Sequence, residues 1–283
     1  MSRILAIVVL YNPSIEILEK WRTYVQCHSQ VFFYFVDNSQ FFANVANTEN
    51  SIYYGCQSNL GIAAAQNIGI KYAIENGYYY TIFFDQDSEI DGDFIQDIVG
   101  EFDYVRKKND RIVILGPRII NKDTLLEYKH REKIVDESYV TASHLISSGS
   151  IVNVDAFKNV GLMNEKMFID YVDFEWCWRA KSKGYLCVKV CNVFMRHKVG
   201  QNMVSFLGIP IVFSAPIRYF YQYRNFLWLL RCSYVPLKWK IKMLLRKVVE
   251  PLFLIVFIDK KKELLVNIMR GIISGMNNKM NCE

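Results

Sequence analysis

Tyr80-Thr-Ile-Phe-Phe-Asp-Gln-Asp-Ser88 is an apolar run that ends abruptly in two carboxylates, one residue apart. Residues 80–84 are all β-branched or aromatic, which predicts a strand buried in a sheet. Asp85 and Asp87 then lie at the carboxyl end of that strand, the edge at which open α/β sheets bind ligands. Two carboxylates there suit a divalent cation and the phosphates that it neutralises. An Asp/Ser turn without a ligand is the alternative.

The first forty residues repeat this pattern of an apolar run followed by polar residues. Residues 4–10 predict a strand that ends in the turn Tyr11-Asn12-Pro13, and a helix with Ser14 as its N-cap is expected over 14–27. A second strand over 31–36 is closed by Asp37-Asn38-Ser39. Strand, helix and strand with polar residues at each carboxyl end indicate a parallel, doubly wound sheet. Asp37 and Asn38 serve either that edge or an ordinary turn.

A glycine-containing turn leads into an alanine-rich helix at Asn59-Leu-Gly-Ile-Ala-Ala-Ala-Gln-Asn-Ile-Gly-Ile70. The helix is expected to run to about Glu75 and to stop at Asn76-Gly77, since glycine adopts the left-handed cap conformation without steric cost. Its amino terminus is expected to offer N–H groups to phosphate, although close packing on the sheet also explains the alanines. Further strands are expected at 112–115 and 186–195, and further helices at 91–108 and 154–160.

The stretch Met167-Phe-Ile-Asp-Tyr-Val-Asp-Phe-Glu-Trp-Cys-Trp-Arg179 is the second chemical feature of the chain. If Asp173 opens a helix, Asp173 and Glu175 lie at the positive end of its dipole. Helix capping explains such residues by itself. The addition of Asp170 and of two tryptophans favours sugar binding, because sugar sites combine carboxylates with aromatic faces. Ser148-Gly149 brings bare backbone toward the same sheet edge, and His197 closes a strand.

Composition limits the class of protein. The chain has 283 residues, 52% of them hydrophobic and 15% aromatic, which excludes a disordered chain. Seven cysteines without a Cys-x-x-Cys pair argue against a disulfide framework or zinc site and for a reducing, cytoplasmic compartment. The apolar amino terminus lacks a cleavage signal, so it predicts a buried strand, and no stretch reaches the roughly 20 apolar residues of a membrane span.

The positive charge of the chain is concentrated at its end. The formal net charge is +6, yet the segment from Arg218 onward holds 13 Lys/Arg against 4 Asp/Glu, so the preceding part is net acidic. Within that segment basic residues alternate with aromatic and aliphatic ones at helical spacing, which indicates an interfacial membrane helix attracted to anionic lipid. A plain helical cap on the core is the alternative. Nucleic-acid binding is disfavoured, because no polar basic face forms.

Several ordered blocks resemble the inverting family-two glycosyltransferases of the GT-A fold, and in particular the bacterial rhamnosyltransferases. The resemblance covers about residues 4–230, and the order of the blocks is more specific than any one of them. The blocks are Val-Leu-Tyr-Asn-Pro at 9–13, Val-Asp-Asn-Ser at 36–39, Asn-Leu-Gly-Ile-Ala-Ala-Ala-Gln-Asn at 59–67, Asp-Gln-Asp-Ser at 85–88, Ser-Gly-Ser at 148–150, Phe168–Arg179, Arg-His-Lys-Val-Gly at 196–200 and Arg-Tyr-Phe-Tyr-Gln-Tyr-Arg-Asn at 218–225.

The resemblance implies a role for each matching residue. Asp173 matches the catalytic base, and Asp87 and His197, with Asp85, match a site for Mg²⁺ or Mn²⁺. The usual Glu-Asp pair reads Val172-Asp173 here, which leaves either Asp170 or Glu175 as the partner of the base. The residues implied to bind the nucleotide are Tyr11, Asn12, Asp37, Asn38, Asn59, Gly61, Asn67 and Asp85. Those implied at the donor or acceptor sugar are Ser148, Gly149, Asp170, Glu175, Trp176 and Arg224.

The resemblance also implies an organisation and an activity. Residues 1–203 are expected to form a Rossmann-like mixed sheet flanked by helices, with a nucleotide-sugar half to about 117 and an acceptor half over 118–203. Residues 204–283 are expected to form a basic, membrane-associating helical region at the inner face of the cell membrane.

The implied reaction moves L-rhamnose from dTDP-L-rhamnose to a lipid-linked saccharide, in the synthesis of O-antigen or another bacterial surface polysaccharide. The alternatives are a different donor sugar (galactofuranose, glucose or N-acetylglucosamine) and a non-catalytic protein that binds the membrane surface.

Overall fold

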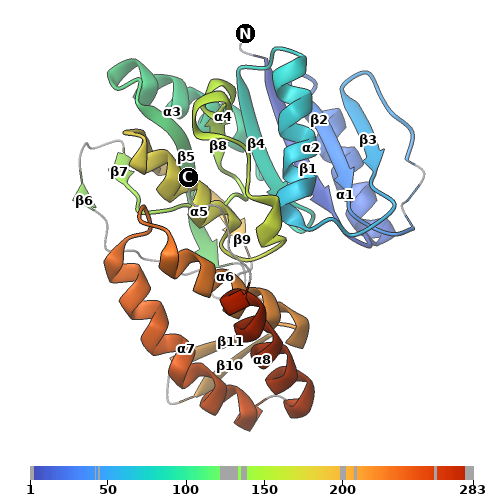
Figure 1. The fold of residues 1–283 in the computed structure, drawn as a ribbon. Coiled ribbons are helices and arrows are strands. Elements are labelled where there is room, and N and C mark those ends of the chain that lie inside the picture. Colours follow the sequence, from blue (N-terminus) through green and yellow to red (C-terminus); the bar gives the residue numbers. More distant parts are fainter. Residues whose placement is uncertain are drawn as a thin grey trace.

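The protein is described by a computed structural model over residues 3–41, 43, 45–121, 133–134, 139–197, 202–206, 209–257 and 260–277. A sheet with the strand order β3-β2-β1-β4-β8-β5-β9-β7-β6 forms its centre (Figure 1). The strands of this sheet are β1 (Ile4–Leu10), β2 (Phe32–Asp37), β3 (Ser51–Gly55), β4 (Tyr80–Asp85), β5 (Ile112–Asn121), β6 (Lys133–Ile134), β7 (Tyr139–Thr141), β8 (Ile151–Asn153) and β9 (Leu186–His197).

The sheet is mixed, as expected. Strands β1 to β5 and β9 run in one direction, because β1, β2, β3 and β4 pair in parallel and β8 is antiparallel to both β4 and β5. The carboxyl ends of β1, β2 and β4 therefore meet at one edge, where polar residues follow each strand. The register pairs Leu10 with Asp37 and Val9 with Asp85, so these carboxylates start from neighbouring positions.

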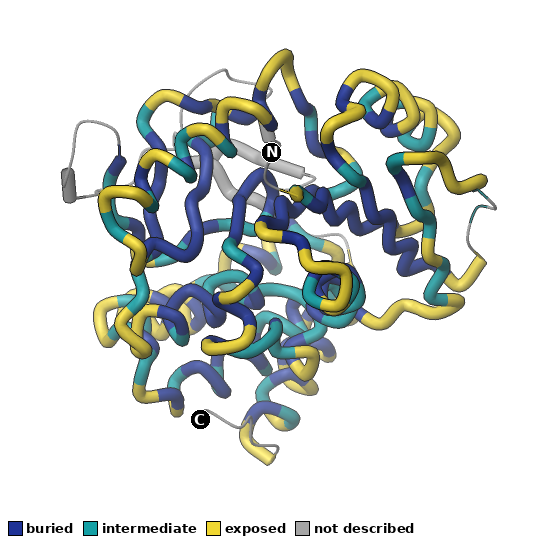
Figure 2. Tube along the Cα trace, turned by 90° about the horizontal axis from the view of Figure 1, so that it is seen from above, coloured by how far each residue is buried: buried dark blue, intermediate teal, exposed yellow. Residues whose placement is uncertain are grey.

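Helices cover both faces of this sheet. Helices α1 (Ile15–Cys27) and α3 (Phe94–Lys108) pack on one face, and α2 (Ile62–Glu75), α4 (Val154–Val160) and α5 (Val172–Ser182) on the other. Figure 2 shows the buried strands between these layers. The expected N-cap is confirmed, since Ser14 Oγ accepts from the N–H of Ile17. The alanine-rich α2 lies close to the sheet, because a Cβ at Gly69 would meet Ile7 Cγ2 at 2.7 Å.

The last part of the chain forms a hairpin and three helices below the sheet (Figure 1). The expected boundary at residue 203 falls inside a strand, and the helices begin at Pro216. Helices α6 and α8 touch closely, because a Cβ at Gly271 would meet the carbonyl oxygen of Phe220 at 2.5 Å. The elements are β10 (Asn202–Phe206), β11 (Ile209–Phe213), α6 (Pro216–Arg231), α7 (Leu237–Phe257) and α8 (Lys261–Asn277).

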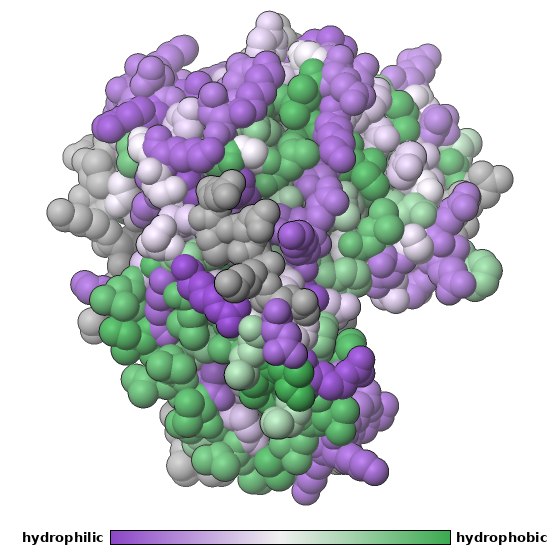
Figure 3. Space-filling view, in the orientation of Figure 1, coloured by the Kyte–Doolittle hydropathy of each residue, from purple (hydrophilic) through white to green (hydrophobic). Residues whose placement is uncertain are grey.

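Helix α7 leaves much of its apolar surface uncovered. Leu245, Val248, Leu252 and Val256 recur at helical spacing with 65 to 68% of each side chain exposed. Figure 3 shows the resulting hydrophobic surface on the part of the molecule that carries α7 and α8. In the described ranges, no helix is both long and apolar enough to cross a bilayer.

The cysteines follow the expectation with one exception. Cys27, Cys56, Cys177, Cys187 and Cys191 are free thiols. Cys232, at the end of α6, is disulfide-bonded, a bridge that the sequence analysis did not predict.

Candidate active site

The edge where β1, β2 and β4 end is held together by a chain of hydrogen bonds. Asp37 is fully buried and accepts from the N–H and hydroxyl of Ser39 at 3.0 and 2.5 Å, and from the hydroxyl of Tyr53. Ser39 Oγ in turn accepts from the N–H of Asn12 at 2.6 Å. The N–H of Tyr11 donates to Gln86 Oε1 at 2.8 Å. The structure thus brings together three of the predicted nucleotide-binding segments.

Asn38 connects this network to the turn before α2. Its Nδ2 donates to Asn59 Oδ1 at 3.0 Å, and its Oδ1 accepts from the N–H of Leu60 at 2.7 Å. Gly61 completes the turn with a φ of 84°, and a Cβ there would meet the carbonyl oxygen of Phe168 at 2.6 Å, so only glycine fits. Asn38 and Gly61 therefore shape the edge, and Asn59 remains exposed beside it.

Hydrogen bonds from helix α1 hold the turn that carries the predicted metal ligands Asp85 and Asp87. Lys20 Nζ donates to the carbonyl oxygens of Gln86 and Ser88 at 3.0 and 2.9 Å, and Trp21 Nε1 donates to that of Gln86 at 3.0 Å. Ser88 Oγ accepts from the N–H of Asp85 at 3.0 Å. Asp87 is exposed at the tip, while Asp85 is half-buried.

The backbone places this turn beside the end of β9. Glu89 and Arg196 form an antiparallel β-bridge. Asp87 and His197 therefore lie at neighbouring backbone positions of the two bridged segments. The side chain of His197 lies outside the described residues. Among the residues that are described, no three His, Cys, Asp or Glu side chains gather into a metal site. Two carboxylates at neighbouring positions, with a histidine backbone opposite them, fit a divalent cation in residue type and place.

Asp173 lies in the first turn of α5, as predicted. Its Oδ2 accepts from the N–H of Ser147 at 3.2 Å, and its Oδ1 from the N–H of Phe174 at 2.9 Å. Burial, and to a smaller extent the charge of Asp85, raises the pKa of Asp173 from 3.8 to about 7 against the lowering effect of the N–H donors. A carboxylate with a pKa near neutrality is suited to accept a proton.

The loop before Asp173 is strained and braced. Phe168, Asp170 and Tyr171 have φ values of 63°, 68° and 65°, a region that costs side-chain-bearing residues of the order of 1–3 kcal/mol each. The buried Asn225 of α6 holds the loop, because its Nδ2 lies 2.9, 2.8 and 3.1 Å from the carbonyl oxygens of Met167, Ile169 and Asp170.

A cavity of about 260 Å³ opens beside Asp173. Its walls come from the start of α2, the residues before β8, the strained loop and the start of α6. Asp170 and Arg218 form an ion pair at this cavity, with Arg218 Nη2 at 2.5 Å and Nε at 3.3 Å from the carboxylate oxygens. Asp170 is thus the second carboxylate beside the predicted base.

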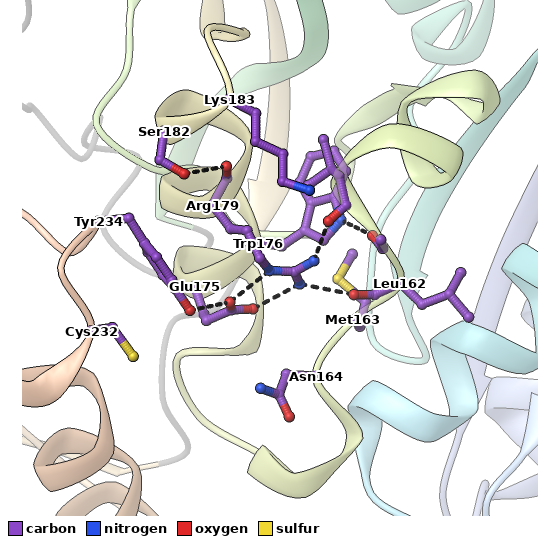
Figure 4. A network of polar contacts seen from close by, with 12 residues as sticks. Leu162, Met163, Asn164, Glu175, Trp176, Arg179, Ser182, Lys183, Cys232 and Tyr234 are labelled. Carbon is purple, nitrogen blue, oxygen red and sulfur yellow. Dashed lines mark hydrogen bonds and ion pairs between the residues drawn. The ribbon is translucent and has the colours of Figure 1, made fainter. Parts of the chain in front are cut away.

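Glu175 does not share that cavity, so its expected role at the sugar is corrected. The buried carboxylate receives two hydrogen bonds from Arg179, at 2.7 and 2.9 Å, and one from the hydroxyl of Tyr234 at 2.7 Å (Figure 4). Arg179 also donates to the carbonyl oxygens of Val160 and Leu162. Glu175 therefore anchors α5 to its neighbours, which excludes it as the partner of Asp173.

Trp176 is corrected in the same way. Its ring is 1% exposed, and its Nε1 donates to the carbonyl oxygen of Gly161 at 2.8 Å. A ring with no open face cannot stack on a sugar. The tryptophan that suggested sugar binding in the sequence is therefore a residue of the hydrophobic core.

Asn67 and the amino terminus of α2 also differ from expectation. The buried amide of Asn67 donates to Met163 O and Glu165 Oε1 and accepts from the N–H of Met163, so it joins α2 to the next segment and has no donor left for a nucleotide. The N–H groups of Ile62 and Ala63 donate to the carbonyl oxygen of Phe168 at 2.7 and 3.4 Å. These two donors are therefore not available to phosphate.

Three further residues predicted at the sugar form hydrogen bonds within the protein, namely Ser148, Gly149 and Arg224. The buried Ser148 shares a hydrogen bond with Ser88 at 2.8 Å, and the N–H of Gly149 donates to Phe83 O at 2.7 Å. Arg224 donates to the carbonyl oxygens of Lys166 and Met167 at 2.8 and 3.0 Å. The hydroxyl of Ser148, the N–H of Gly149 and the guanidinium of Arg224 each have a hydrogen-bond partner within the protein.

Sequence reasoning missed Lys20, Gln66, Arg218 and Asn225 as site residues. Gln66, Arg218 and Asn225 lie in blocks that carried the resemblance, so a signal existed for them. Lys20 stands in ordinary helical sequence and gave none.

The chain is similar in sequence to known proteins. The profile described as glycosyl transferase family 2 matches residues 35–168. The dTDP-rhamnosyl transferase RfbF of Shigella flexneri is 37% identical over 250 residues, which cover 83% of this chain and 82% of that protein.

Solved structures show the same fold at low sequence identity. S. aureus TarS 1–349 superposes with a TM-score of 0.53 at 13% identity, over 97% of this chain and 81% of that one. GalNAc-T7 with UDP, GalNAc and Mn²⁺ gives 0.54 at 12% identity over 70% of this chain, which spans only 44% of the GalNAc-T7 chain. The predicted GT-A fold is confirmed.

Proposed function

Because the chain belongs to glycosyl transferase family 2, we propose that it is an inverting rhamnosyltransferase that uses dTDP-L-rhamnose as its donor. The donor is proposed from the similarity to the dTDP-rhamnosyl transferase RfbF. The observation that carries the catalytic part is Asp173, a carboxyl group with a pKa of about 7 at the wall of a sugar-sized cavity.

In the proposed reaction Asp173 takes the proton of an acceptor hydroxyl. The hydroxyl oxygen forms a bond to the anomeric carbon while the bond from that carbon to the diphosphate breaks, and the electron pair leaves with the nucleotide. Attack opposite to the leaving group inverts the anomeric centre. This displacement requires a base beside the acceptor and a site that holds the leaving nucleotide. Asp173 is the proposed base, and the sheet edge where β1, β2 and β4 end is the proposed nucleotide site.

Asp87 and His197, with Asp85, are the proposed ligands of Mg²⁺ or Mn²⁺. When bound, the cation supplies positive charge to the leaving diphosphate. The support is the position of these residues, since the turn and the end of β9 meet at the bridge between Glu89 and Arg196. Tyr11, Asn12, Asp37 and Asn59 are the proposed contacts of the nucleotide.

The proposed acceptor is a lipid-linked saccharide at the cytoplasmic face of the membrane, where O-antigen or a related surface polysaccharide is built. Helix α7 supports this location, because its exposed apolar stripe is flanked by the exposed cations Lys238, Lys242 and Arg246. We further propose that residues up to about 117 bind the nucleotide sugar and residues 118–203 the acceptor.

A donor panel tests the reaction. Release of nucleotide is measured from dTDP-L-rhamnose, UDP-galactofuranose, UDP-glucose and UDP-N-acetylglucosamine, each with Mn²⁺, with Mg²⁺ and with a chelator. We expect dTDP release to exceed the others and to require a divalent cation. Preference for another donor overturns the rhamnosyl assignment, and full activity in chelator overturns the metal site.

Flotation with anionic lipid vesicles tests the location. The triple change Leu245→Gln, Val248→Gln and Leu252→Gln is expected to abolish flotation and to leave nucleotide release from the donor intact. Ile15→Gln with Tyr79→Gln, which changes side chains exposed by 75% and 60% elsewhere, is the control. Unchanged flotation of the triple variant contradicts the proposed surface.

A further inference from the structure

An unmatched polar atom stands beside the predicted base. Gln66, on α2, is 2% exposed, and its Oε1 is one of four buried side-chain polar atoms that find no hydrogen-bond partner within the described structure. It is the only one of the four whose residue lines the cavity of Asp173. A buried carbonyl oxygen without a partner lowers the stability of the folded protein. We infer that Gln66 is a specificity-determining residue that accepts a hydrogen bond from a hydroxyl of the transferred sugar.

Other buried amides nearby show that this arrangement is unusual. Asn67, the next residue, uses both ends of its amide within the protein, and Asn225 holds three carbonyl oxygens. Both residues therefore have a structural explanation. Gln66 has no such explanation, although it lies on the same helix as Asn67 and is equally buried.

The cavity suits a single deoxy sugar. At about 260 Å³ it is smaller than the roughly 300–1,000 Å³ of pockets that enclose drug-sized ligands, which fits one ring and not a whole nucleotide sugar. Its lining includes the apolar residues Ile62, Ile146, Val172 and Phe174 and the polar residues Gln66, Ser147, Asp170, Tyr171, Asp173 and Arg218. A lining that combines apolar and polar side chains suits a ring that carries both a methyl group and hydroxyls.

Helix α2 leads from the nucleotide edge to this cavity, which indicates that the donor sugar occupies the cavity. This step rests on the proposed function. Asn59 and Gly61 at the nucleotide edge immediately precede Ile62, and Gln66 follows one turn later on the same helix. A sugar that is attached to a diphosphate at that edge extends along the first turn of α2 toward Asp173. The ring is then placed between the nucleotide and the base, as displacement at its anomeric carbon requires.

The test separates contact with the sugar from contact with the nucleotide. Gln66→Met keeps the length of the side chain and removes its polar atoms, and Gln26→Met makes the same change at an exposed position of α1. Dissociation constants are measured by calorimetry for dTDP-L-rhamnose and for dTDP, with the melting temperature of the free protein. For Gln66→Met we expect affinity for dTDP-L-rhamnose to fall about 3- to 10-fold, the worth of one hydrogen bond, and affinity for dTDP to stay unchanged.

The melting temperature gives an independent readout. Because Met replaces an atom that has no partner in the free protein, Gln66→Met should melt at the same temperature as the wild type or higher. A lower melting temperature, an equal loss of affinity for both ligands, or no loss for either overturns the role of Gln66. If the wild type binds another donor of the panel, the rhamnosyl assignment fails and the same comparison is made with that donor and its nucleotide. If it binds no nucleotide sugar, both proposals fail.

Discussion

The turn at 85–88 and the loop at 168–173 both present aspartates at the functional edge of the sheet, but they do so in opposite ways. The turn has ordinary backbone geometry, is fastened by Lys20 and Trp21, and leaves Asp87 exposed. The loop contains three residues with positive φ and surrounds Asp173 with protein. Burial therefore raises the pKa of Asp173, the proposed base, whereas Asp87, the proposed metal ligand, faces solvent.

The two regions differ in how much structural support their carboxyl groups need. A solvent-facing carboxylate needs only a fixed turn. A carboxyl group with a raised pKa needs burial and a loop that is held against its own strain, and α6 supplies that support through Asn225.

The largest effect is expected from the base itself. Asp173→Asn should fold and bind dTDP-L-rhamnose, yet lose about 10²- to 10⁴-fold in transfer rate, since general base catalysis contributes roughly that much. Calorimetry of donor binding and single-turnover transfer measure the two properties. Transfer at near wild-type rate would falsify the base assignment.

The turn is tested by removing its exposed carboxylate. Asp87→Ala should weaken Mn²⁺-dependent donor binding by more than the roughly 10- to 100-fold seen when a supporting group of a metal site is lost. Calorimetry with and without Mn²⁺ gives the measurement, and Asp97→Ala, at an exposed position of α3, is the control. Equal metal dependence in both variants rules out Asp87 as a ligand.

The brace is expected to have a smaller effect. Asn225→Ala leaves up to three carbonyl oxygens of the strained loop without a donor, which should lower the free energy of unfolding by about 1–3 kcal/mol. The transfer rate should fall while affinity for dTDP is kept, because the nucleotide edge is untouched. Asn267→Ala, a buried amide of α8, controls for the loss of an amide. A variant that loses stability alone would show that the loop holds its shape without the brace.

The smallest effect concerns pH. The pKa of Asp173 is raised from 3.8 to about 7, so between these values the folded protein binds a proton that the unfolded chain releases. This group therefore makes stability decline as pH rises from about 4 to about 7, and Asp173→Asn should lose that part of the slope. Urea unfolding across this range measures it, and transfer by the wild type should rise with pH toward a plateau above about 7. Parallel curves for both proteins would show an ordinary pKa.

Much of the fold could be predicted from the sequence because apolar runs and caps are local signals. The strands at 4–10 and 80–85, the N-cap at Ser14 and the helix that opens near Asp173 all depend on residues close together in the chain. The short β8, antiparallel between two parallel neighbours, gave no such signal, since its pairing is decided by distant strands.

The site was predicted less well because residue type does not reveal a partner. Glu175, Trp176 and Asn67 have the chemistry of binding residues, but their partners lie within the protein. Gln66 looks like any helical glutamine until the missing partner of its Oε1 is seen. The position of a residue along a helix can be predicted from the nearby sequence. Whether a buried polar group finds a hydrogen-bond partner depends on the whole fold.

The contact of Asn225 with the loop at 167–170 also bears on the order of folding. The residues proposed to contact the nucleotide all lie within the first 90 residues, whereas the base is held in place by a helix that begins only at Pro216. During synthesis the residues of this edge are therefore made well before the helix that holds the base in place. Pulse-labelled hydrogen exchange during refolding should accordingly protect β1, β2 and β4 before the loop, and simultaneous protection would contradict this order.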